Sequence, residues 1–379
     1  MMMAGATGSI VADKKWVLQL CHGYSPPFGD VARQWHALFE GTDYRVLTVF
    51  LTGAPDSQIK SLVGGEVIFL GFDSKALRGL KIRQIQEIRN LHKQYQFKFA
   101  IAHRYKSIYI ASHLPKIKVF GVSHAYDVYS RFLRRRYVMS QSDRLFLIGV
   151  SNAIRDDARA ALPRFPARKI QTVYNHIDYD TMHDFLLTKE AAREYLQIEK
   201  DAFVVGNVGR LHPDKDQATL IAAFAKILPV VPDARLLIMG EGRLRGALER
   251  QIEALGVARQ VELKGRVPNA SRLFRAFDLF ALSSDYEPFG MVLLEAMAAG
   301  IPVISSNCGG APEVLGDAGL LFPVANSEAL AQALLGIYGM GQEERRSMVE
   351  ALQERLKGNF TDEAVRGAFW KQSFAGELC

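Results

Sequence analysis

The sequence predicts an α/β protein with two domains, each built on a parallel β-sheet covered by helices. Short apolar runs rich in β-branched residues alternate with amphipathic stretches along the chain, which is typical of such sheets. The strand-like runs are continuously apolar, as expected when helices cover both faces of a sheet. A chain of 379 residues exceeds what one hydrophobic core usually organises, so two domains are expected.

The strand candidates fall into two series along the chain. Those of the first half are Val17–Leu20, Arg45–Phe50, Glu66–Leu70, Phe99–Ala102, Lys118–Val122, Leu145–Val150 and Ile170–Tyr174. Those of the second half are Phe203–Val208, Arg235–Met239, Val261–Leu263, Leu279–Leu282 and Pro302–Ser305. The clearest helical patterns span Asp216–Leu228, Leu244–Leu255 and Ser327–Tyr338.

The domain boundary is expected at the segment Asn175–Asp178, which follows one strand and precedes a polar helical stretch. We therefore predict a first domain over residues 1–178, completed by a C-terminal helix within 360–379, and a second over 179–359. Ligands of open α/β sheets bind beyond the carboxyl ends of the strands. Two such sheets facing each other would form one cleft.

Composition places the chain among globular cytoplasmic proteins. No apolar stretch approaches the roughly 18 residues that a membrane-spanning helix needs. Lys14 and Lys15 precede only the short apolar run 16–20, which is too brief for a secretory signal. The three cysteines, Cys21, Cys308 and Cys379, are odd in number, far apart and without metal-ligand spacing, which favours a reducing compartment.

Charge is distributed unevenly between the two halves. Residues 1–180 contain 26 lysines and arginines against 14 aspartates and glutamates, whereas residues 181–379 contain 21 against 26. This asymmetry indicates that the first half meets an anionic partner, such as nucleic acid, a membrane surface or a phosphorylated acceptor. A solvated basic face is the alternative.

The most informative stretch lies at 282–296, where a strand ends in a polar loop and a helix starts near Phe289. Glu287 stands just ahead of this helix and Glu295 lies inside it. Free amides around Gly290 and Met291 would form a phosphate site, because a helix N-terminus attracts anions. The two carboxylates could then accept hydrogen bonds from sugar and ribose hydroxyls. The alternative is an acid favoured by the helix dipole followed by an ordinary surface glutamate.

This stretch resembles, almost letter for letter, the motif of two spaced glutamates in retaining GT-B glycosyltransferases of the family 4 (group 1) type. The segment 208–216 likewise resembles the family's G-R-L…K-G segment, whose Arg and Lys grip the donor diphosphate. That likeness implies a diphosphate clamp by Arg210 and Lys215, with Asp216 standing where the family usually has Gly. Two cations aimed at the leaving phosphates would replace a metal ion.

Weaker likenesses extend the resemblance. The turn after the strand at 237–239 resembles the family's G-x-G turn and contains Gly240, while Arg266 and Val267 match the segment whose backbone holds the nucleobase. In the first half, 123–127 resembles the loop whose His faces the transferred sugar, which implies this role for His124. The segment 173–178 resembles the family's hinge, and the first strand-to-helix turn offers only Gly29 where the family has a glycine pair.

The resemblance implies a GT-B fold, α/β with two Rossmann-like domains facing across a cleft, and retention of the sugar's configuration. Its catalytic residues would be His124, Arg210, Lys215 and Glu287. Its donor-binding residues would be Gly29, Gly240, Arg266, Val267, Glu287, Phe289, Gly290, Met291, Val292 and Glu295. We expect a monomer without metal or cofactor that transfers a hexosyl or N-acetylhexosaminyl unit, from a UDP-sugar rather than a GDP-sugar. The similarity to bacterial lipopolysaccharide core enzymes favours a core glycan or glycolipid as acceptor.

Several alternatives stay open at this point. The acceptor could be a lipid-linked glycan or an exopolysaccharide, and a nucleotide-sugar epimerase, a phosphorylase or a non-catalytic binding module could share the fold. The pairs Asp178/Asp180 and Asp214/Asp216 match the spacing of metal-binding D-x-D motifs.

Two basic stretches in the first half predict peripheral contact with an anionic membrane surface, on the inner face of the cytoplasmic membrane, rather than with nucleic acid. One is 131–139, which contains four arginines and five apolar residues; the other comprises Lys75, Arg78, Lys81, Arg83 and Arg89. Each basic residue near an anionic leaflet contributes about 1 kcal/mol. An ordinary amphipathic helix whose arginines bind acceptor phosphates or water is the alternative.

Overall fold

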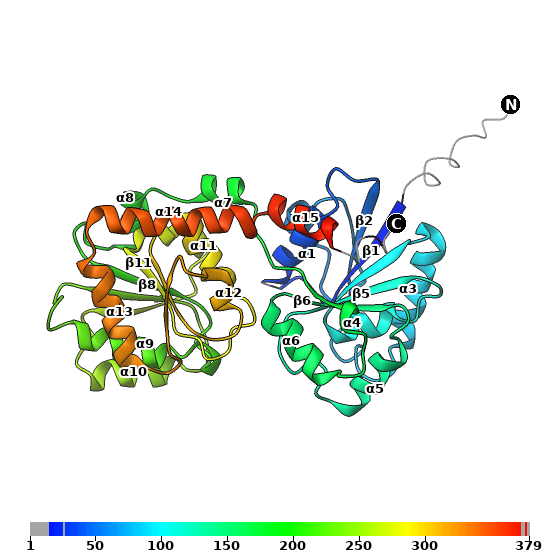
Figure 1. The fold of residues 1–379 in the computed structure, drawn as a ribbon, viewed down its shortest axis with the longest axis horizontal. Coiled ribbons are helices and arrows are strands. Elements are labelled where there is room, and N and C mark those ends of the chain that lie inside the picture. Colours follow the sequence, from blue (N-terminus) through cyan, green and yellow to red (C-terminus); the bar gives the residue numbers. More distant parts are fainter. Residues whose placement is uncertain (1–14, 26, 373–375, 377–379) are drawn as a thin grey trace. The chain divides into compact units, whose positions relative to one another are not determined.

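The computed structural model describes residues 15–25, 27–372 and 376, and the chain divides into two compact units (Figure 1). Unit 1 comprises residues 1–175 together with 365–379, and unit 2 comprises residues 176–364. The division thus falls close to residue 178, where the sequence predicts a boundary. Lys14, Cys379 and part of the predicted segment 360–379 lie outside the described residues.

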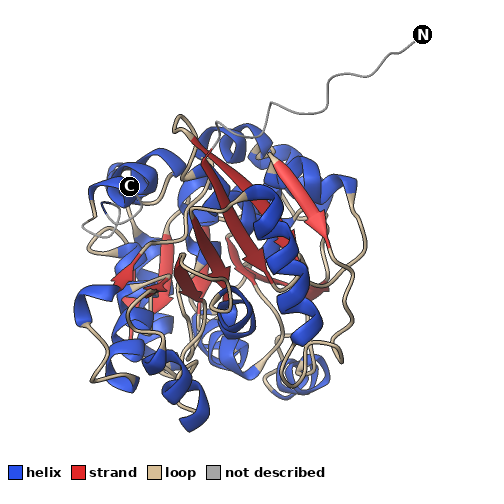
Figure 2. Ribbon diagram, turned by 90° about the vertical axis from the view of Figure 1, so that its right-hand side faces the viewer, coloured by secondary structure: helices blue, strands red, loops and turns tan. Residues whose placement is uncertain are grey.

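Unit 1 is organised around a seven-stranded sheet in the order β3-β2-β1-β4-β5-β6-β7. Neighbouring strands are parallel, with β1 pairing β2 and β4 on its two sides. The strands are β1 (Lys15–Cys21), β2 (Tyr44–Phe50), β3 (Glu66–Phe69), β4 (Phe99–His103), β5 (Lys118–Ser123), β6 (Leu145–Gly149) and β7 (Ile170–Thr172). The helices are α1 (Phe28–Ala37), α2 (Ser57–Val63), α3 (Ile82–Tyr95), α4 (Arg104–Ala111), α5 (Phe132–Ser140), α6 (Asn152–Ala161) and the short η1 (Ala167–Lys169). Figure 2 shows strands between blue helices.

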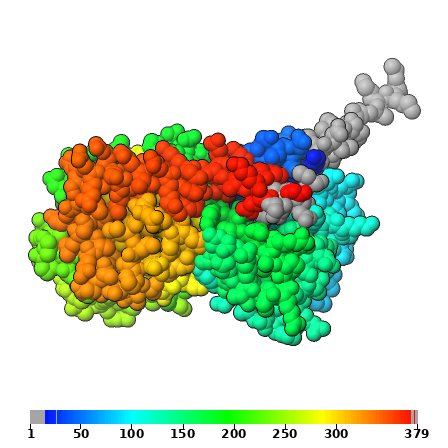
Figure 3. All heavy atoms as spheres, viewed as in Figure 1, coloured from blue at the N-terminus to red at the C-terminus, as the bar shows by residue number. Residues whose placement is uncertain are grey.

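The C-terminal helix α15 (Asp362–Lys371) packs into unit 1 through its aromatic residues. The indole of Trp370 donates a hydrogen bond to the backbone oxygen of Leu38 at 2.8 Å. Phe369 lies edge-to-face against Trp35, with ring centroids 6.2 Å apart. Figure 3 shows this red helix beside the blue segments of unit 1. Helix α15 therefore covers apolar surface of unit 1.

Unit 2 contains a six-stranded sheet in the order β10-β9-β8-β11-β12-β13, again with parallel neighbours. Its strands are β8 (Val204–Val208), β9 (Arg235–Met239), β10 (Val261–Gly265), β11 (Leu279–Leu282), β12 (Val303–Ser306) and β13 (Leu320–Phe322). Its helices are α7 (Tyr179–Phe185), α8 (Lys189–Leu196), η2 (Pro213–Lys215), α9 (Gln217–Ile227), α10 (Arg245–Ala254), η3 (Ala270–Ala276), α11 (Met291–Ala299), α12 (Ala311–Leu315), α13 (Ser327–Gly339) and α14 (Gln342–Asn359).

Every strand that the sequence predicts is confirmed, with ends shifted by at most a few residues. Strand β13 is missed because it has three residues at the sheet edge and only Phe322 of them is buried. Such a segment carries too little apolar periodicity to stand out from a loop. Among the described residues, no helix is both long and apolar enough to cross a membrane.

The strand orders place one switch point in each sheet. In unit 1 the chain leaves β1 toward β2 on one side, and β4 then forms on the other side of β1. In unit 2 the same reversal occurs between β8 and β11. Loops leaving these strand ends diverge in opposite directions and leave a crevice where ligands bind. The two switch points therefore locate the candidate sites within each unit.

Candidate active site

Two loops of unit 2 meet at the switch point of its sheet, although they lie far apart in the sequence. One connects β8 to α9 and contains Lys215; the other connects β11 to α11 and contains Glu287. The amide of Asp285 donates to the backbone oxygen of Asp214 at 3.2 Å, and the Ser283 hydroxyl donates to that of Lys215 at 3.0 Å. These bonds fix the two predicted donor-binding motifs against each other.

Lys215 and Glu287 form an ion pair at this junction. The Lys215 Nζ atom donates to Glu287 Oε2 at 2.6 Å, and the two side chains are only 17% and 8% exposed. The Ser284 hydroxyl donates to the same carboxylate oxygen at 3.2 Å. Sequence reasoning assigned the lysine to the diphosphate and the glutamate to the sugar, and did not anticipate their pairing. The pair holds both side chains in defined positions beside the strand ends.

Arg210 is held differently, at the surface of the same loop. Its guanidinium donates to Asp214 Oδ2 at 2.9 Å, and the arginine side chain is 68% exposed. The other oxygen of Asp214 contacts His212 Nδ1 at 2.6 Å. Because an exposed ion pair is weak, Arg210 can exchange its carboxylate partner for a ligand phosphate at small cost.

Asp216 occupies the position where the family usually has glycine, and the backbone explains the substitution. Its φ is +40°, in the left-handed region that Gly and, next, Asn and Asp tolerate. Its side chain accepts a hydrogen bond from the amide of Thr219 at 3.3 Å and so caps α9. An aspartate therefore satisfies both the turn and the helix start.

Gly240 lies where the loops after β8 and β9 interlock. Its φ is +156°, and a Cβ atom at this position would stand 1.8 Å from the backbone oxygen of Gly209. Across the same junction, the amide of Leu211 donates to the backbone oxygen of Glu241 at 2.9 Å. Close backbone packing explains why residue 240 is a glycine. The predicted contact of Gly240 with the donor stays a prediction.

The remaining predicted residues of unit 2 surround the start of α11 and the end of β10. Gly290, with φ +101°, precedes the first residue of α11, and the ring of Phe289 is buried against Phe360 with centroids 5.9 Å apart. Met291, Val292 and Glu295 lie in α11 and are half-buried. Arg266, exposed, and Val267, half-buried, directly follow β10.

Gly29 lies in the first turn of α1 rather than in the preceding loop. It is buried, and a Cβ atom there would stand 3.2 Å from the Ile59 side chain and 3.3 Å from that of Leu62. The absence of a side chain thus lets α1 pack closely on α2. The sequence placed Gly29 in the strand-to-helix turn, whereas the helix begins one residue earlier; its predicted contact with the donor stays a prediction.

His124 is half-buried after β5 in unit 1 and ends a chain of polar groups whose other members, His103 and Gln19, are buried. Its Nε2 atom lies 3.1 Å from Nδ1 of His103, and His103 Nε2 lies 3.3 Å from the side-chain amide of Gln19. That amide also donates to the backbone oxygen of Ala32 at 3.0 Å, which assigns it as the nitrogen. Sequence reasoning missed His103 and Gln19, whose only signal is a polar side chain within or at the end of an apolar strand.

This chain of contacts assigns the tautomers of both histidines. Because Gln19 donates to His103 Nε2, the proton of neutral His103 resides on Nδ1 and points to His124 Nε2. His124 therefore carries its own proton on Nδ1. Burial, with a contribution from Arg104, lowers the pKa of His124 to about 3, and burial lowers the pKa of His103 well below its usual range. His124 is thus a neutral hydrogen-bond donor, not a base.

The acidic pairs considered for metal binding have structural partners. Asp178 accepts hydrogen bonds from the amide of Thr181 at 3.0 Å and from its hydroxyl at 2.7 Å, which caps α7. Asp214 pairs with Arg210 and His212, as described above. Within the described ranges, no group of three or more His, Cys, Asp or Glu residues is placed to hold a metal ion.

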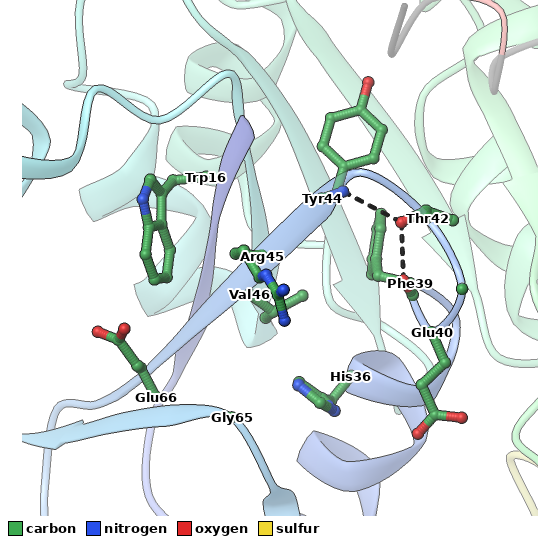
Figure 4. Close-up of a pocket in the computed structure, with 11 residues that line it drawn as sticks. Trp16, His36, Phe39, Glu40, Thr42, Tyr44, Arg45, Val46, Gly65 and Glu66 are labelled. Atoms are coloured by element: carbon green, nitrogen blue, oxygen red, sulfur yellow. Dashed lines mark hydrogen bonds between the residues drawn. The ribbon is translucent and has the colours of Figure 1, made fainter. Parts of the chain in front are cut away.

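Unit 1 also contains a cavity that is separate from the candidate site. It encloses about 600 Å³ and is lined by residues that include Trp16, His36, Tyr44, Arg45 and Glu66 (Figure 4). Trp16, Tyr44 and Glu66 stand at the amino-terminal ends of their strands. Ligands of α/β sheets bind at the opposite, carboxyl ends, so volume alone does not make this cavity the active site.

Comparison with known proteins gives a family match for most of unit 2. Residues 188–355, which contain both loops of the unit 2 switch point, match the family described as glycosyl transferases group 1. The chain is 29% identical over 295 residues to N-acetyl-alpha-D-glucosaminyl L-malate synthase of Bacillus anthracis, which covers 75% of this chain and 74% of that protein. It is 32% identical over 179 residues to the lipopolysaccharide core biosynthesis glycosyltransferase LpsE of Rhizobium meliloti, covering 47% of this chain and 51% of that protein.

Solved structures extend the likeness to both units. The HepE protein of Anabaena, in a crystal structure with UDP and glucose, superposes with a TM-score of 0.77 at 20% identity, covering 93% of this chain and 97% of that one. At this identity the superposition establishes the fold alone. Residues 188–355 thus match the model of group 1 glycosyltransferases, and the two-unit architecture has the GT-B fold of the solved structures.

Proposed function

We propose that the chain is a retaining, metal-independent glycosyltransferase that moves a hexosyl or N-acetylhexosaminyl unit from a UDP-sugar to a lipopolysaccharide-core or related glycan acceptor. The observation that carries this proposal is the junction of Lys215 and Glu287 at the carboxyl ends of β8 and β11. A cation and a carboxylate in one crevice match a donor that carries phosphates at one end and sugar hydroxyls at the other. The UDP bound to the Anabaena relative supports UDP as the nucleotide.

In this proposal, donor binding breaks the ion pair, and its two members then contact different parts of the donor. Lys215 turns to the diphosphate together with Arg210, and Glu287 is released to accept hydrogen bonds from sugar hydroxyls. The amides at the start of α11, beside Gly290, add partial positive charge for the phosphates. The backbone at Arg266 and Val267 would hold the nucleobase, and Glu295 the ribose.

The transfer step then follows from these placements. The bond between the anomeric carbon and the phosphate oxygen breaks, and its electron pair stays on the departing diphosphate. Lys215 and Arg210 stabilise the negative charge that develops there, in place of a metal ion. The acceptor oxygen attacks the same face of the sugar, and its proton passes to the departing phosphate. His124, with its proton on Nδ1, donates a hydrogen bond to the transferred sugar.

Donor turnover is the direct test. Purified protein is incubated with UDP-glucose, UDP-N-acetylglucosamine or GDP-mannose, with and without a lipopolysaccharide-core acceptor, and the anomeric configuration of the product is read by NMR. Acceptor-dependent release of UDP with retained configuration is expected. Acceptor-independent conversion of the donor sugar would instead favour an epimerase, and an inverted product would overturn the retaining mechanism. A lipid-linked glycan in place of the core acceptor tests the second acceptor class.

We further propose that unit 1 docks peripherally on an anionic membrane surface beside an amphiphilic acceptor. At the start of α5, Phe132 and Leu133 are 64% and 77% exposed and are followed by exposed Arg135 and Arg136. Before and at the start of α3, Leu80 and Ile82 are 68% and 70% exposed. Exposed apolar side chains beside basic ones are typical of surfaces that enter the lipid headgroup region.

Vesicle flotation tests this docking. Binding should require anionic lipid, weaken with added salt, and weaken again when Arg135 and Arg136 are both changed to Gln. Absence of binding to anionic vesicles at low salt would remove the membrane role and leave donor turnover unaffected.

A further inference from the structure

A second cavity of unit 1 opens at the carboxyl ends of its strands. It encloses about 320 Å³ and is lined by His22, Arg104, Tyr105, Lys106, His124, Ala125, Val128 and Arg134. His22 follows β1, Arg104 begins α4 directly after β4, and His124 follows β5. The cavity therefore occupies the switch point of the unit 1 sheet, where a ligand is expected.

The charge of this lining is positive and uncompensated. Arg104, Lys106 and Arg134 contribute three cations, and no lining residue is acidic. Within the described part of the chain, none of the three forms an ion pair. The pKa of nearby Lys81 is lowered by burial and by the charges of Lys106 and Arg134, which places a fourth cation beside them. Cations gathered without a carboxylate repel one another, and an anion would relieve this repulsion.

Two of these cations are held in place by contacts that leave their charge uncompensated. The guanidinium of Arg104 lies 3.8 Å from the centre of the Phe28 ring, and its backbone has φ +67°, which is uncommon for arginine. Arg134 donates to the backbone oxygen of Val128 at 3.1 Å and lies 4.7 Å from the centre of the Tyr105 ring. Aromatic rings position a guanidinium without neutralising it, so the donors remain available to a ligand.

A further polar atom of the lining lacks a partner. The Nδ1 atom of His22 is buried and makes no hydrogen bond. Burial and the charges of Lys106 and Arg104 lower the pKa of this histidine, so it stays neutral and can offer one donor. A buried polar atom without a partner costs stability.

We propose that this cavity is a subsite for a phosphate group carried by the acceptor, bound by Arg104, Lys106 and Arg134. The inference rests on the proposed function, because it places the acceptor in unit 1 beside His124. Three cations with a fourth nearby match a phosphate monoester, which carries up to two negative charges and several acceptor oxygens. Lys215 and Arg210 already serve the donor diphosphate in unit 2, so this subsite is left for a second anion.

Binding of inorganic phosphate, measured calorimetrically in the presence of saturating UDP, tests the subsite. Because UDP fills the donor site, phosphate binding at that site does not contribute to the measured heat. Lys106→Gln and Arg134→Gln should each weaken phosphate binding about ten- to hundredfold, the usual effect of losing a charge-assisted hydrogen bond. The affinity for UDP should stay unchanged in both variants. Lys93→Gln is the matched control, because this exposed lysine lies in the last turn of α3 and does not line the cavity.

The two variants carry different folding risks. Arg134 donates to Val128, so Arg134→Gln can also loosen the loop, and circular dichroism must show that the variant is folded. The Lys106 side chain makes no hydrogen bond or ion pair within the described residues, so Lys106→Gln is the cleaner test. Equal phosphate affinity of Lys106→Gln and the unaltered chain would overturn the inference. Failure of the unaltered chain to bind or turn over any nucleotide sugar would instead overturn the proposed function.

Two competing ligands distinguish whether the phosphate belongs to a glycan or to a lipid. A soluble sugar monophosphate should compete with inorganic phosphate if the acceptor is a phosphorylated glycan. Vesicles of phosphatidylcholine with phosphatidic acid should compete, and those without it should not, if the phosphate belongs to a lipid. Competition by either, lost in Lys106→Gln, supports the subsite. Competition by neither overturns it.

Discussion

The two switch points of this molecule share one topology but differ in how their charges are arranged. In unit 2 the cations have carboxylate partners: Lys215 pairs with Glu287 at 2.6 Å and Arg210 with Asp214 at 2.9 Å. In unit 1 the cations Arg104, Lys106 and Arg134 line a cavity without an acidic residue. A paired crevice is preorganised and nearly neutral before its ligand arrives, whereas an unpaired one attracts an anion over a distance.

This difference also explains why the sequence motifs are dense in one unit and sparse in the other. The loops of unit 2 are interlocked through backbone contacts that exclude a side chain, as at Gly240. Such geometry restricts the residue type at each position and so leaves a recognisable pattern. In unit 1 the lining cations only need to reach a common cavity, and several residue types and positions satisfy that need.

The largest expected effect on turnover concerns the paired cations of unit 2. Lys215→Ala and Arg210→Ala should each lower the turnover rate about 100- to 1,000-fold, or about 2.7–4 kcal/mol, because each removes charge stabilisation from the leaving phosphates. Steady-state kinetics measure this loss. Near-normal turnover in either variant would show that the residue does not belong to the clamp.

The two variants should differ in stability, since only one of them leaves a buried charge. Lys215→Ala deprives Glu287, 8% exposed, of its partner, which typically costs about 3–5 kcal/mol. Adding Glu287→Gln should recover much of this loss. Arg210 is mostly exposed, so Arg210→Ala should unfold at nearly the normal urea concentration. Equal destabilisation in both single variants would contradict the difference in burial.

A smaller effect tests the interlocked loops of unit 2. Gly240→Ala would place a methyl group 1.8 Å from the Gly209 oxygen, and relief of such a contact costs about 1–3 kcal/mol. Urea unfolding measures the change. Gly246→Ala is the control: it lies in α10, and a methyl group there would meet only the end of the flexible Arg250 side chain at 3.7 Å. That substitution should leave stability unchanged or raise it.

The histidine pair of unit 1 predicts a dependence of stability on pH. The pKa of His124 is lowered to about 3 in the folded chain from an ordinary value of about 6.5. Between these values the unfolded state binds a proton that the folded state does not, so the free energy of unfolding falls as pH falls below about 6.5. The slope is about 1.4 kcal/mol per pH unit for each such histidine.

Urea unfolding between neutral pH and pH of about 4 measures this slope. His124→Phe should flatten it, since one titrating group is removed while an aromatic ring stays beside His103. A slope unchanged by the substitution would contradict the assignment of His124 as a neutral group in the folded chain.

The smallest expected effect concerns metal ions. With Arg210 and Lys215 stabilising the leaving phosphates, a chelator should leave turnover essentially unchanged. Asp214→Asn should then act only through the position of Arg210. Loss of activity with chelator, and its recovery with magnesium or manganese, would show that an acidic pair binds metal after all.

The sequence predicted much of the fold, because continuous apolar runs mark buried parallel strands regardless of their context. It failed at β13, which is short and lies at a sheet edge. For the candidate site, the motifs indicated Lys215 and Glu287 separately. Their hydrogen bond depends on which strand lies beside which, and local patterns carry no information on strand order.

The sequence by itself determined the α/β class, the two-domain organisation and the motifs of a group 1 glycosyltransferase, because these follow from local hydrophobic periodicity and from loops whose geometry restricts residue type. Only the tertiary structure decided that β1 stands beside β4 and β8 beside β11. That adjacency assembles the Lys215–Glu287 pair, the Gln19–His103–His124 chain and the cationic cavity. Each brings together segments that are distant in sequence, so their contacts arise from sheet topology, which no single segment encodes.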